Sequence, residues 1–276
     1  MVKKRPGYGR LTRASDRFNA KWRIYYEDRF TEWAQLSIIN KNGFRYPLAE
    51  AEKDYFLAVV LKILYASRLK DRLVFKGGTA LNHLYLDQLR FSEDLHFATL
   101  GSVALSDLEE VFSEYGFLEI KKASPSEYSL KIDRLKFVGP LGQPNSLKID
   151  IDLTQPVILA ARPIAYQNLY GVVVEVLGME LVEICAEKVR AVNERARFRE
   201  FYDLTMALRK TEVEPVKVKA ILKNKELRKD LDPQRILDNL EIAHDARNSG
   251  SENLLYREEL AEDEIRDALN RILSLL

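Results

Sequence analysis

The sequence predicts an α+β fold, with a β-sheet in its middle part and a helical part at its C-terminal end. Up to Gly178, short apolar segments bounded by turn residues alternate with amphipathic helical segments. After Gly178 the hydrophobic spacing is helical throughout. We therefore expect an N-terminal basic arm and helix over 1–45, a sheet-containing core over 46–177 and a helical domain over 178–276.

Composition limits the function classes. Of the 276 residues, 46% are hydrophobic and 31% are charged, which allows a core and argues against a membrane protein. The single cysteine, Cys185, excludes an intrachain disulfide and a cysteine-based zinc site. The net charge of +1 gives no overall reason to expect nucleic-acid binding. No apolar segment follows the basic start, so we expect a cytoplasmic protein.

Two helices are expected before the sheet. Aromatic residues recur at helical spacing over 21–38, and apolar residues do so over 48–69. The segment Asn40–Gly43 between them has the composition of a turn. Ahead of both, residues 1–17 carry six basic side chains and one acidic side chain. This arm is either a solvated tail or a segment that contacts phosphates.

The remaining elements follow from periodicity and turn signals. Strands are expected over 73–75, 95–97, 117–122, 127–137, 146–153 and 172–176. Helices are expected over 79–85, 106–114, 179–194, 198–209, 214–223, 232–241 and 257–276. Loops are expected over 139–145 and 243–253.

A glycine-rich turn joins the first expected strand to a helix. It reads Lys76-Gly77-Gly78-Thr79. A helix that begins directly after a strand directs free backbone N–H groups at an anion, and glycines let a phosphate come close. Thr79 can cap the helix and offers a hydroxyl. The alternative is a tight structural turn with an ordinary helix cap.

Carboxylates lie on one face of two expected strands. Asp94 and His96 alternate with apolar residues, as do Asp150 and Asp152 within 148–153. If the strands are neighbours, these four side chains converge and repel one another unless a cation lies among them. Magnesium prefers such oxygen ligands. The alternative is a set of solvated carboxylates paired with lysines.

The helix over 179–194 has a lysine on its apolar stripe. This residue is Lys188, and an inward lysine needs an anionic partner. Either a triphosphate or a protein carboxylate would serve. Farther on, Arg199 and Asp203 are four residues apart and predict a surface ion pair.

Taken in order, these motifs resemble those of the AbiEii/AbiGii-type nucleotidyltransferase toxins. The similar segments are 75–81, 90–97, 148–150, 186–191 and 199–203. The resemblance implies a polymerase-β-like nucleotidyltransferase core with a mixed sheet and flanking helices. It also implies that the helical C-terminal domain completes the active-site cleft. Members of this family are toxins paired with an antitoxin, and some add nucleotides to the end of tRNA.

The resemblance also implies roles for particular residues. Nucleoside triphosphate binding would fall to Lys76, Gly77, Gly78, Thr79 and Lys188. Metal binding, of Mg²⁺ or Mn²⁺, would fall to Asp94, His96, Asp150 and Asp152. The catalytic set would be Asp94, Asp150, Lys188 and Asp203.

Two residues depart from the family pattern, and one of them is Glu200, which stands where aspartate is common in the later motif. His96 stands where these toxins have a second aspartate, and a neutral imidazole suits manganese or zinc better than magnesium. Three hypotheses follow. The chain transfers a nucleoside monophosphate from a triphosphate to RNA, such as tRNA, or to a protein. Alternatively, it is a degenerate module that binds a nucleotide or a partner. The third is a nucleic-acid-binding scaffold that uses the basic arm and Arg190–Arg199.

Overall fold

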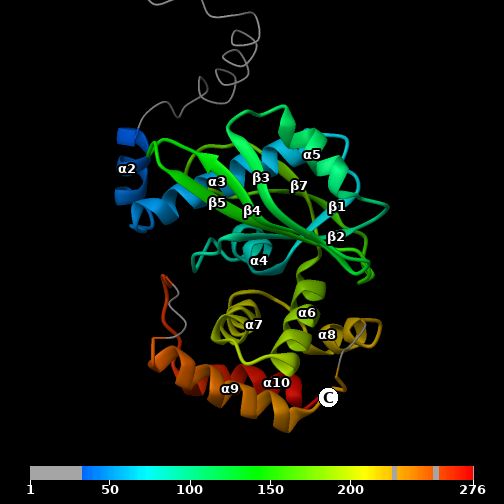
Figure 1. The fold of residues 1–276 in the computed structure, drawn as a ribbon. Coiled ribbons are helices and arrows are strands. Elements are labelled where there is room, and N and C mark those ends of the chain that lie inside the picture. The colour runs from blue at the N-terminus through cyan, green and yellow to red at the C-terminus, as the bar shows by residue number, and fades with distance from the viewer. Residues whose placement is uncertain (1–32, 226–228, 251–254, 276) are drawn as a thin grey trace, which may run out of the picture.

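The computed structural model describes residues 33–225, 229–250 and 255–275, which form a mixed sheet with helices on both faces. The basic arm and the aromatic residues before Trp33 lie outside the described residues. Figure 1 shows the sheet in the upper half of the molecule and helices α6 to α10 in the lower half. The predicted α+β class is confirmed.

The bounds of the elements agree closely with the periodicity of the sequence. The helices are α2 (Trp33–Asn42), α3 (Leu48–Tyr65), α4 (Gly77–Tyr85), α5 (Leu105–Ser113), α6 (Leu181–Glu194), α7 (Phe198–Lys210), α8 (Pro215–Leu222), α9 (Pro233–Asn248) and α10 (Glu262–Leu273). The strands are β1 (Leu73–Lys76), β2 (Asp94–Thr99), β3 (Leu118–Pro125), β4 (Ser129–Val138), β5 (Pro144–Asp152), β6 (Arg162–Ala165) and β7 (Glu175–Gly178). None of the helices in these described segments is long and apolar enough to cross a membrane.

The sheet has the strand order β3-β4-β5-β2-β1-β7-β6. Strand β2 runs antiparallel to β1 and parallel to β5. In the β2–β5 register, His96 lies opposite Asp150 and Asp94 lies opposite Lys148. The two strands that carry the carboxylates are therefore neighbours, as the convergence argument required.

The two faces of the sheet have different partners. Leu95 and Phe97 of β2 are fully buried on the face that packs against α3, where Phe56 stacks on Phe137 with ring centroids 3.9 Å apart. Helix α4 covers the other face and contacts α6 and α7. The cysteine at position 185 is fully buried in α6, and burial raises the pKa of its thiol to about 12.

Three expectations were wrong. Residues 40–42 were expected to belong to a turn but form the end of α2. Strand β6 was not predicted because it is a short, largely exposed edge strand that contains Pro163, so it has no apolar stripe. Residues 243–248 were expected to be loop but continue α9. Residues 243–248 are mostly polar because Ala243 is the only one of them that is buried. Arg247 lies over the Phe198 ring, with its Cζ 4.4 Å from the ring centroid.

Candidate active site

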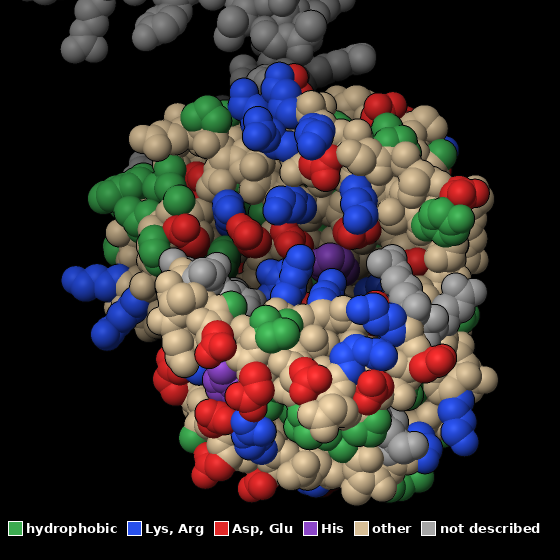
Figure 2. Space-filling view, turned by 60° about the horizontal axis from the view of Figure 1, so that its bottom comes forward, with side chains coloured by type: hydrophobic (Ala, Val, Ile, Leu, Met, Phe, Trp, Pro, Cys, Tyr) green, Lys and Arg blue, Asp and Glu red, His purple; other side chains and the backbone are tan. Residues whose placement is uncertain are grey.

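A cavity of about 940 Å³ lies between the sheet and helices α6 and α7. Among the described residues, its sheet wall carries three aspartates, one histidine and two lysines, and its helical wall carries four arginines, one lysine and three glutamates. The space-filling view shows the same region as a hollow lined with basic side chains (Figure 2). The site is therefore built from both halves of the molecule, and both walls carry charged side chains.

The glycine turn lies where β1 meets α4 on the cavity wall. Lys76 is extended, Gly77 has φ +80°, and no side chain caps the first turn of α4. A Cβ at Gly77 would lie 3.0 Å from the Cβ of His96, and one at Gly78 would collide with the Arg90 guanidinium. Only glycine allows this close packing, and the uncapped helix start can bind an anion.

Thr79 does not lie on the cavity wall. It is fully buried in α4, and its hydroxyl is within hydrogen-bonding distance of the Asp94 carbonyl oxygen (2.5 Å) and of Ser92 Oγ (2.7 Å). The predicted helix cap is also absent, because α4 begins two residues earlier, with Lys76 at its N-cap. The hydroxyl thus holds the start of β2 against α4.

The four predicted metal ligands all line the sheet wall. Asp150 lies 3.6 Å from Lys131 Nζ, and Asp152 lies 3.4 Å from Lys76 Nζ. Asp152 also accepts backbone hydrogen bonds at the end of β5. Within the described residues, no three His, Cys, Asp or Glu side chains are grouped so that they could hold a metal ion. The side chains therefore share a wall without forming a ready-made metal site.

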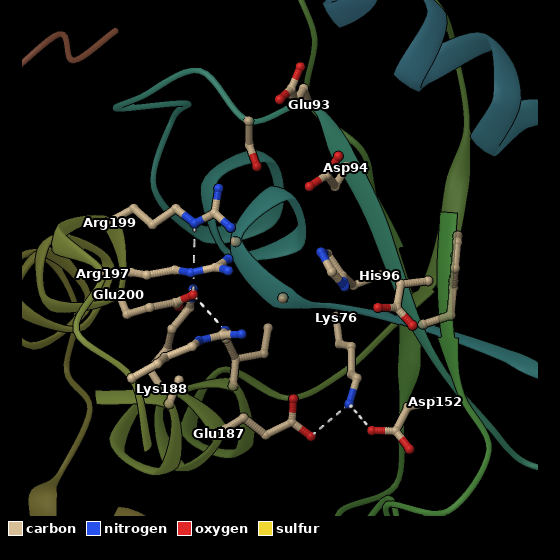
Figure 3. Close-up of a pocket in the computed structure, with 18 of the residues that line it drawn as sticks. Lys76, Glu93, Asp94, His96, Asp152, Glu187, Lys188, Arg197, Arg199 and Glu200 are labelled. Atoms are coloured by element: carbon tan, nitrogen blue, oxygen red, sulfur yellow. Dashed lines mark hydrogen bonds and ion pairs between the residues drawn. The ribbon is translucent and has the colours of Figure 1, made fainter. Parts of the chain in front are cut away.

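Asp94 and His96 differ from these two paired carboxylates. Asp94 Oδ1 is buried and has no hydrogen-bond partner among the described residues, and burial raises the pKa of this carboxyl. Burial, together with nearby Lys76 and Lys188, lowers the pKa of His96 to about 3. The imidazole is therefore neutral at pH 7. Figure 3 shows both side chains on β2, facing the open part of the cavity.

Lys188 is bound by two protein carboxylates. Its Nζ lies 2.6 Å from Glu200 Oε2 and 2.7 Å from Asp203 Oδ2, and all three side chains are buried. Asp203 also accepts two hydrogen bonds from Arg90, of 2.7 and 2.6 Å. The sequence allowed either a triphosphate or a protein carboxylate as the partner of Lys188, and the structure shows protein carboxylates. Arg90 had no predicted role, although an arginine between Leu89 and Phe91 is a signal of a buried ion pair.

The predicted surface ion pair between Arg199 and Asp203 is wrong. Asp203 is fully buried and pairs with Arg90 and Lys188, while Arg199 Nε lies 3.9 Å from Glu200 Oε1. Burial would raise the pKa of Asp203, but Arg90 and Lys188 together lower it. Asp203 is directed inward because almost the whole of α7 is enclosed by neighbouring helices.

A second network joins the sheet to α6. Lys76 Nζ lies 3.1 Å from Glu187 Oε1, and the buried Lys225 Nζ lies 3.2 Å from the same oxygen. Lys225 also pairs with Glu183 at 2.5 Å. Figure 3 shows Lys76 between Asp152 and Glu187. Sequence reasoning missed Lys225, because nothing in its polar surroundings indicates burial.

Arginines line the helical wall. Arg197 and Arg199 extend from the start of α7 toward the cavity, on the side opposite Asp94 and His96 (Figure 3). Arg195 binds Glu200 at 2.6 Å, and Arg190 also lines the cavity. A cavity lined by arginines and by carboxylates suits a ligand that carries phosphate groups together with a divalent cation.

Comparisons with known proteins show which folds this chain resembles. The chain is similar in fold to the nucleotidyltransferase toxin MenT4 from Mycobacterium tuberculosis, with a TM-score of 0.65 and 18% identity over 87% of this chain and 90% of that one. It is also similar to JHP933 from Helicobacter pylori, with a TM-score of 0.53 and 19% identity over 83% and 92% of the two chains. No functionally curated protein matches significantly in sequence.

A protein-family model also matches the sequence itself. The model described as "Nucleotidyl transferase AbiEii toxin, Type IV TA system" matches residues 60–273, which is most of the chain. The match includes the glycine turn, both carboxylate strands and the buried Lys188 network. This chain therefore belongs to the AbiEii family of nucleotidyltransferase toxins of type IV toxin–antitoxin systems.

Proposed function

We propose that this protein is a metal-dependent nucleotidyltransferase that acts in the cytoplasm as the toxin of a toxin–antitoxin pair. It transfers a nucleoside monophosphate from a nucleoside triphosphate to a hydroxyl of RNA, such as tRNA, or of a protein. The acceptor oxygen bonds to the α-phosphorus, the bond to pyrophosphate breaks, and the acceptor hydroxyl gives up its proton. The convergence of the β2 and β5 carboxylates beside the glycine turn supports this proposal most directly.

The triphosphate fits between the two walls. The uncapped start of α4 offers backbone N–H groups, and Lys76 lies at the same corner of the cavity. Arg197 and Arg199 on the facing wall can bind phosphate oxygens from the other side. Lys188 also lines the cavity, and its charge is already balanced by Glu200 and Asp203.

The donors on the sheet wall fit a divalent cation that arrives with the nucleotide. Magnesium is usually held by one or two carboxylates, with waters and substrate phosphates as its other ligands. Asp94, with an unpartnered oxygen, and Asp150 are the carboxylates that would hold it, and the neutral His96 favours Mn²⁺ as an alternative. When bound, the metal lowers the pKa of the acceptor hydroxyl and stabilises charge on the pyrophosphate.

The second candidate function is a module that binds nucleotide without turnover. The absence of a preformed three-ligand group in the described part of the chain favours it, as does the histidine at position 96. The two functions differ in one measurable property. A binding module retains the triphosphate intact, whereas a transferase releases pyrophosphate.

The experiment incubates purified protein with α-³²P-labelled triphosphates and total RNA, with Mg²⁺ or Mn²⁺. We expect label in RNA or in a protein band, together with pyrophosphate release. Asp94→Asn should abolish labelling, while Glu109→Gln, an exposed carboxylate distant from the cavity wall, should leave it unchanged. Tight binding of triphosphate by the wild type without pyrophosphate release, even in His96→Asp, would establish the binding module instead.

A further inference from the structure

The buried lysines Lys76 and Lys188 both line the cavity, but their carboxylate partners hold them differently. Lys188 Nζ lies 2.6 and 2.7 Å from its two carboxylate oxygens. Lys76 Nζ lies farther from its partners, at 3.1 Å from Glu187 Oε1 and 3.4 Å from Asp152 Oδ2 (Figure 3). Both of these contacts are longer than the ~2.7–2.9 Å that is typical of strong charge-assisted hydrogen bonds. Lys76 is therefore the lysine that an incoming anion can more easily recruit.

Neither of these carboxylates depends on Lys76 alone. Asp152 Oδ1 accepts two backbone hydrogen bonds, of 3.1 and 3.0 Å, from the N–H groups that follow the end of β5. Glu187 Oε1 also lies 3.2 Å from Lys225 Nζ. Burial would raise the pKa of Glu187, but the nearby cations, with Lys76 and Lys225 first among them, lower it, so this carboxylate is charged at pH 7. Lys76 can thus leave both carboxylates without leaving either of them unpaired.

Lys225 has an anchor of its own. Its side chain is fully buried, and its Nζ lies 2.5 Å from Glu183 Oε1 and donates a hydrogen bond of 2.7 Å to a backbone carbonyl oxygen of the β5–β6 loop. Glu183 in turn accepts two hydrogen bonds of 2.8 Å from backbone N–H groups of the same loop. The Lys225 ammonium therefore stays beside Glu187 whether or not Lys76 does.

We propose that Lys225 is a positioning residue for phosphate binding, because it keeps Glu187 paired while Lys76 turns from its two carboxylates to the phosphates of the nucleotide. Before the nucleotide binds, Glu187 and Asp152 hold Lys76 beside the glycine turn. When a phosphate group arrives, the Lys76 ammonium exchanges carboxylate oxygens for phosphate oxygens, and Lys225 retains the Glu187 carboxylate. Without Lys225, Glu187 would depend more strongly on Lys76 and would compete with the phosphate for it. The inference rests on the proposed function and deepens it, since it assigns the release of this lysine to residues of α6 and of the segment after α8.

The test measures the affinity of the full chain for inorganic tripolyphosphate, which carries phosphate groups but cannot donate a nucleotide. Isothermal titration calorimetry compares the wild type with Lys225→Met, Glu187→Gln and the double variant. Lys225→Met should weaken binding about tenfold, because Glu187 then holds Lys76 more strongly and leaves an unbalanced negative charge near the phosphates. Glu187→Gln should tighten binding roughly threefold or more, because it frees Lys76. The double variant removes opposite charges and should bind within about twofold of the wild type.

Lys223→Met is the matched control, because it removes an exposed lysine close to Lys225 in the chain, and it should leave the affinity unchanged. In the labelling assay, the same order should appear in KM for the nucleoside triphosphate, with kcat changed by about twofold at most. The opposite signs of the two single variants distinguish this role from a structural one. Loss of an ion pair that only supports the fold would weaken binding in both variants.

Weaker tripolyphosphate binding by Glu187→Gln, or equal affinities of Lys225→Met and Lys223→Met, would overturn the proposal. If circular dichroism shows that Lys225→Met does not fold, the Glu187→Gln and double variants decide, because an affinity of Glu187→Gln no higher than that of the wild type also overturns it. The expected order of tripolyphosphate affinities without any pyrophosphate release would refute only the transferase function.

Discussion

At the scale of single residues, the buried carboxylate of Asp203 holds two cations that come from distant parts of the chain. Arg90 precedes β2 and Lys188 lies in the middle of α6, and both contact the same carboxylate. Because all three groups are out of water, removal of one charge leaves the others uncompensated. The free energy of unfolding should therefore depend on the protonation state of Asp203.

Asp203→Asn should lower the free energy of unfolding by about 3 kcal/mol at pH 7. The folded-state pKa of Asp203 lies below its ordinary value of 3.8, so its stabilisation is complete above that value and is lost as pH falls through the folded pKa. The difference between wild type and variant should thus shrink below pH 3.8. Urea unfolding at pH 7 and pH 3 measures this difference in the free energy of unfolding, and Glu109→Gln serves as the control. A difference that does not change with pH would contradict the lowered pKa of Asp203.

Under the proposed function, His96 should determine which metal the site accepts. His96→Asp adds a carboxylate between Asp94 and Asp150, so Mg²⁺-supported labelling should rise about tenfold, equivalent to ~1.4 kcal/mol. His96→Asn keeps a similar polar side chain without the charge and should not give this gain. Labelling assays with Mg²⁺ and Mn²⁺ in parallel distinguish the two variants. An equal response of both would show that charge at this position is not the determinant.

At the scale of elements, α4 is held against α7 because position 78 has no side chain. Gly78→Ala should destabilise the protein by about 1–3 kcal/mol, since the new methyl group meets the Arg90–Asp203 ion pair. Gly101→Ala is the matched control, because its Cβ would meet only Arg72 atoms at 3.7 and 3.8 Å. Thermal unfolding followed by circular dichroism compares them. Similar losses in both variants would mean that the ion pair can move aside.

The elements also show how far the sequence can be interpreted. The period-two pattern in β2 and β5 predicted which side chains share a face, because alternation is a local property of a strand. The partner of Lys188 was not determined by its own helix, since Glu200 and Asp203 belong to α7 and only tertiary packing selects them. Thr79 was misassigned for the same reason: a hydroxyl at a helix start suits several partners, and the nearby β2 backbone takes it.

At the scale of the whole molecule, ligand binding should stabilise both halves together. The cavity is lined from the sheet and from α6 and α7, so a bound metal–triphosphate complex would contact both sides. At a hundred times its dissociation constant, such a ligand adds about 2.7 kcal/mol to the free energy of unfolding. Thermal-shift measurements should give a larger increase with nucleotide and Mn²⁺ together than the sum of the two alone, and Asp94→Asn should lose the excess. Strictly additive shifts would contradict metal binding at this carboxylate.

The buried thiol of α6 has a practical consequence for spectroscopy. Because Cys185 is the only cysteine of the sequence and is fully buried, maleimide dyes should not label the native chain. Cysteines introduced at the exposed Ser126 beside the cavity and at the exposed Lys217 on α8 would then be the two reactive positions. A donor–acceptor pair attached there would report, one molecule at a time, whether the sheet and the helical layer approach each other when substrate arrives.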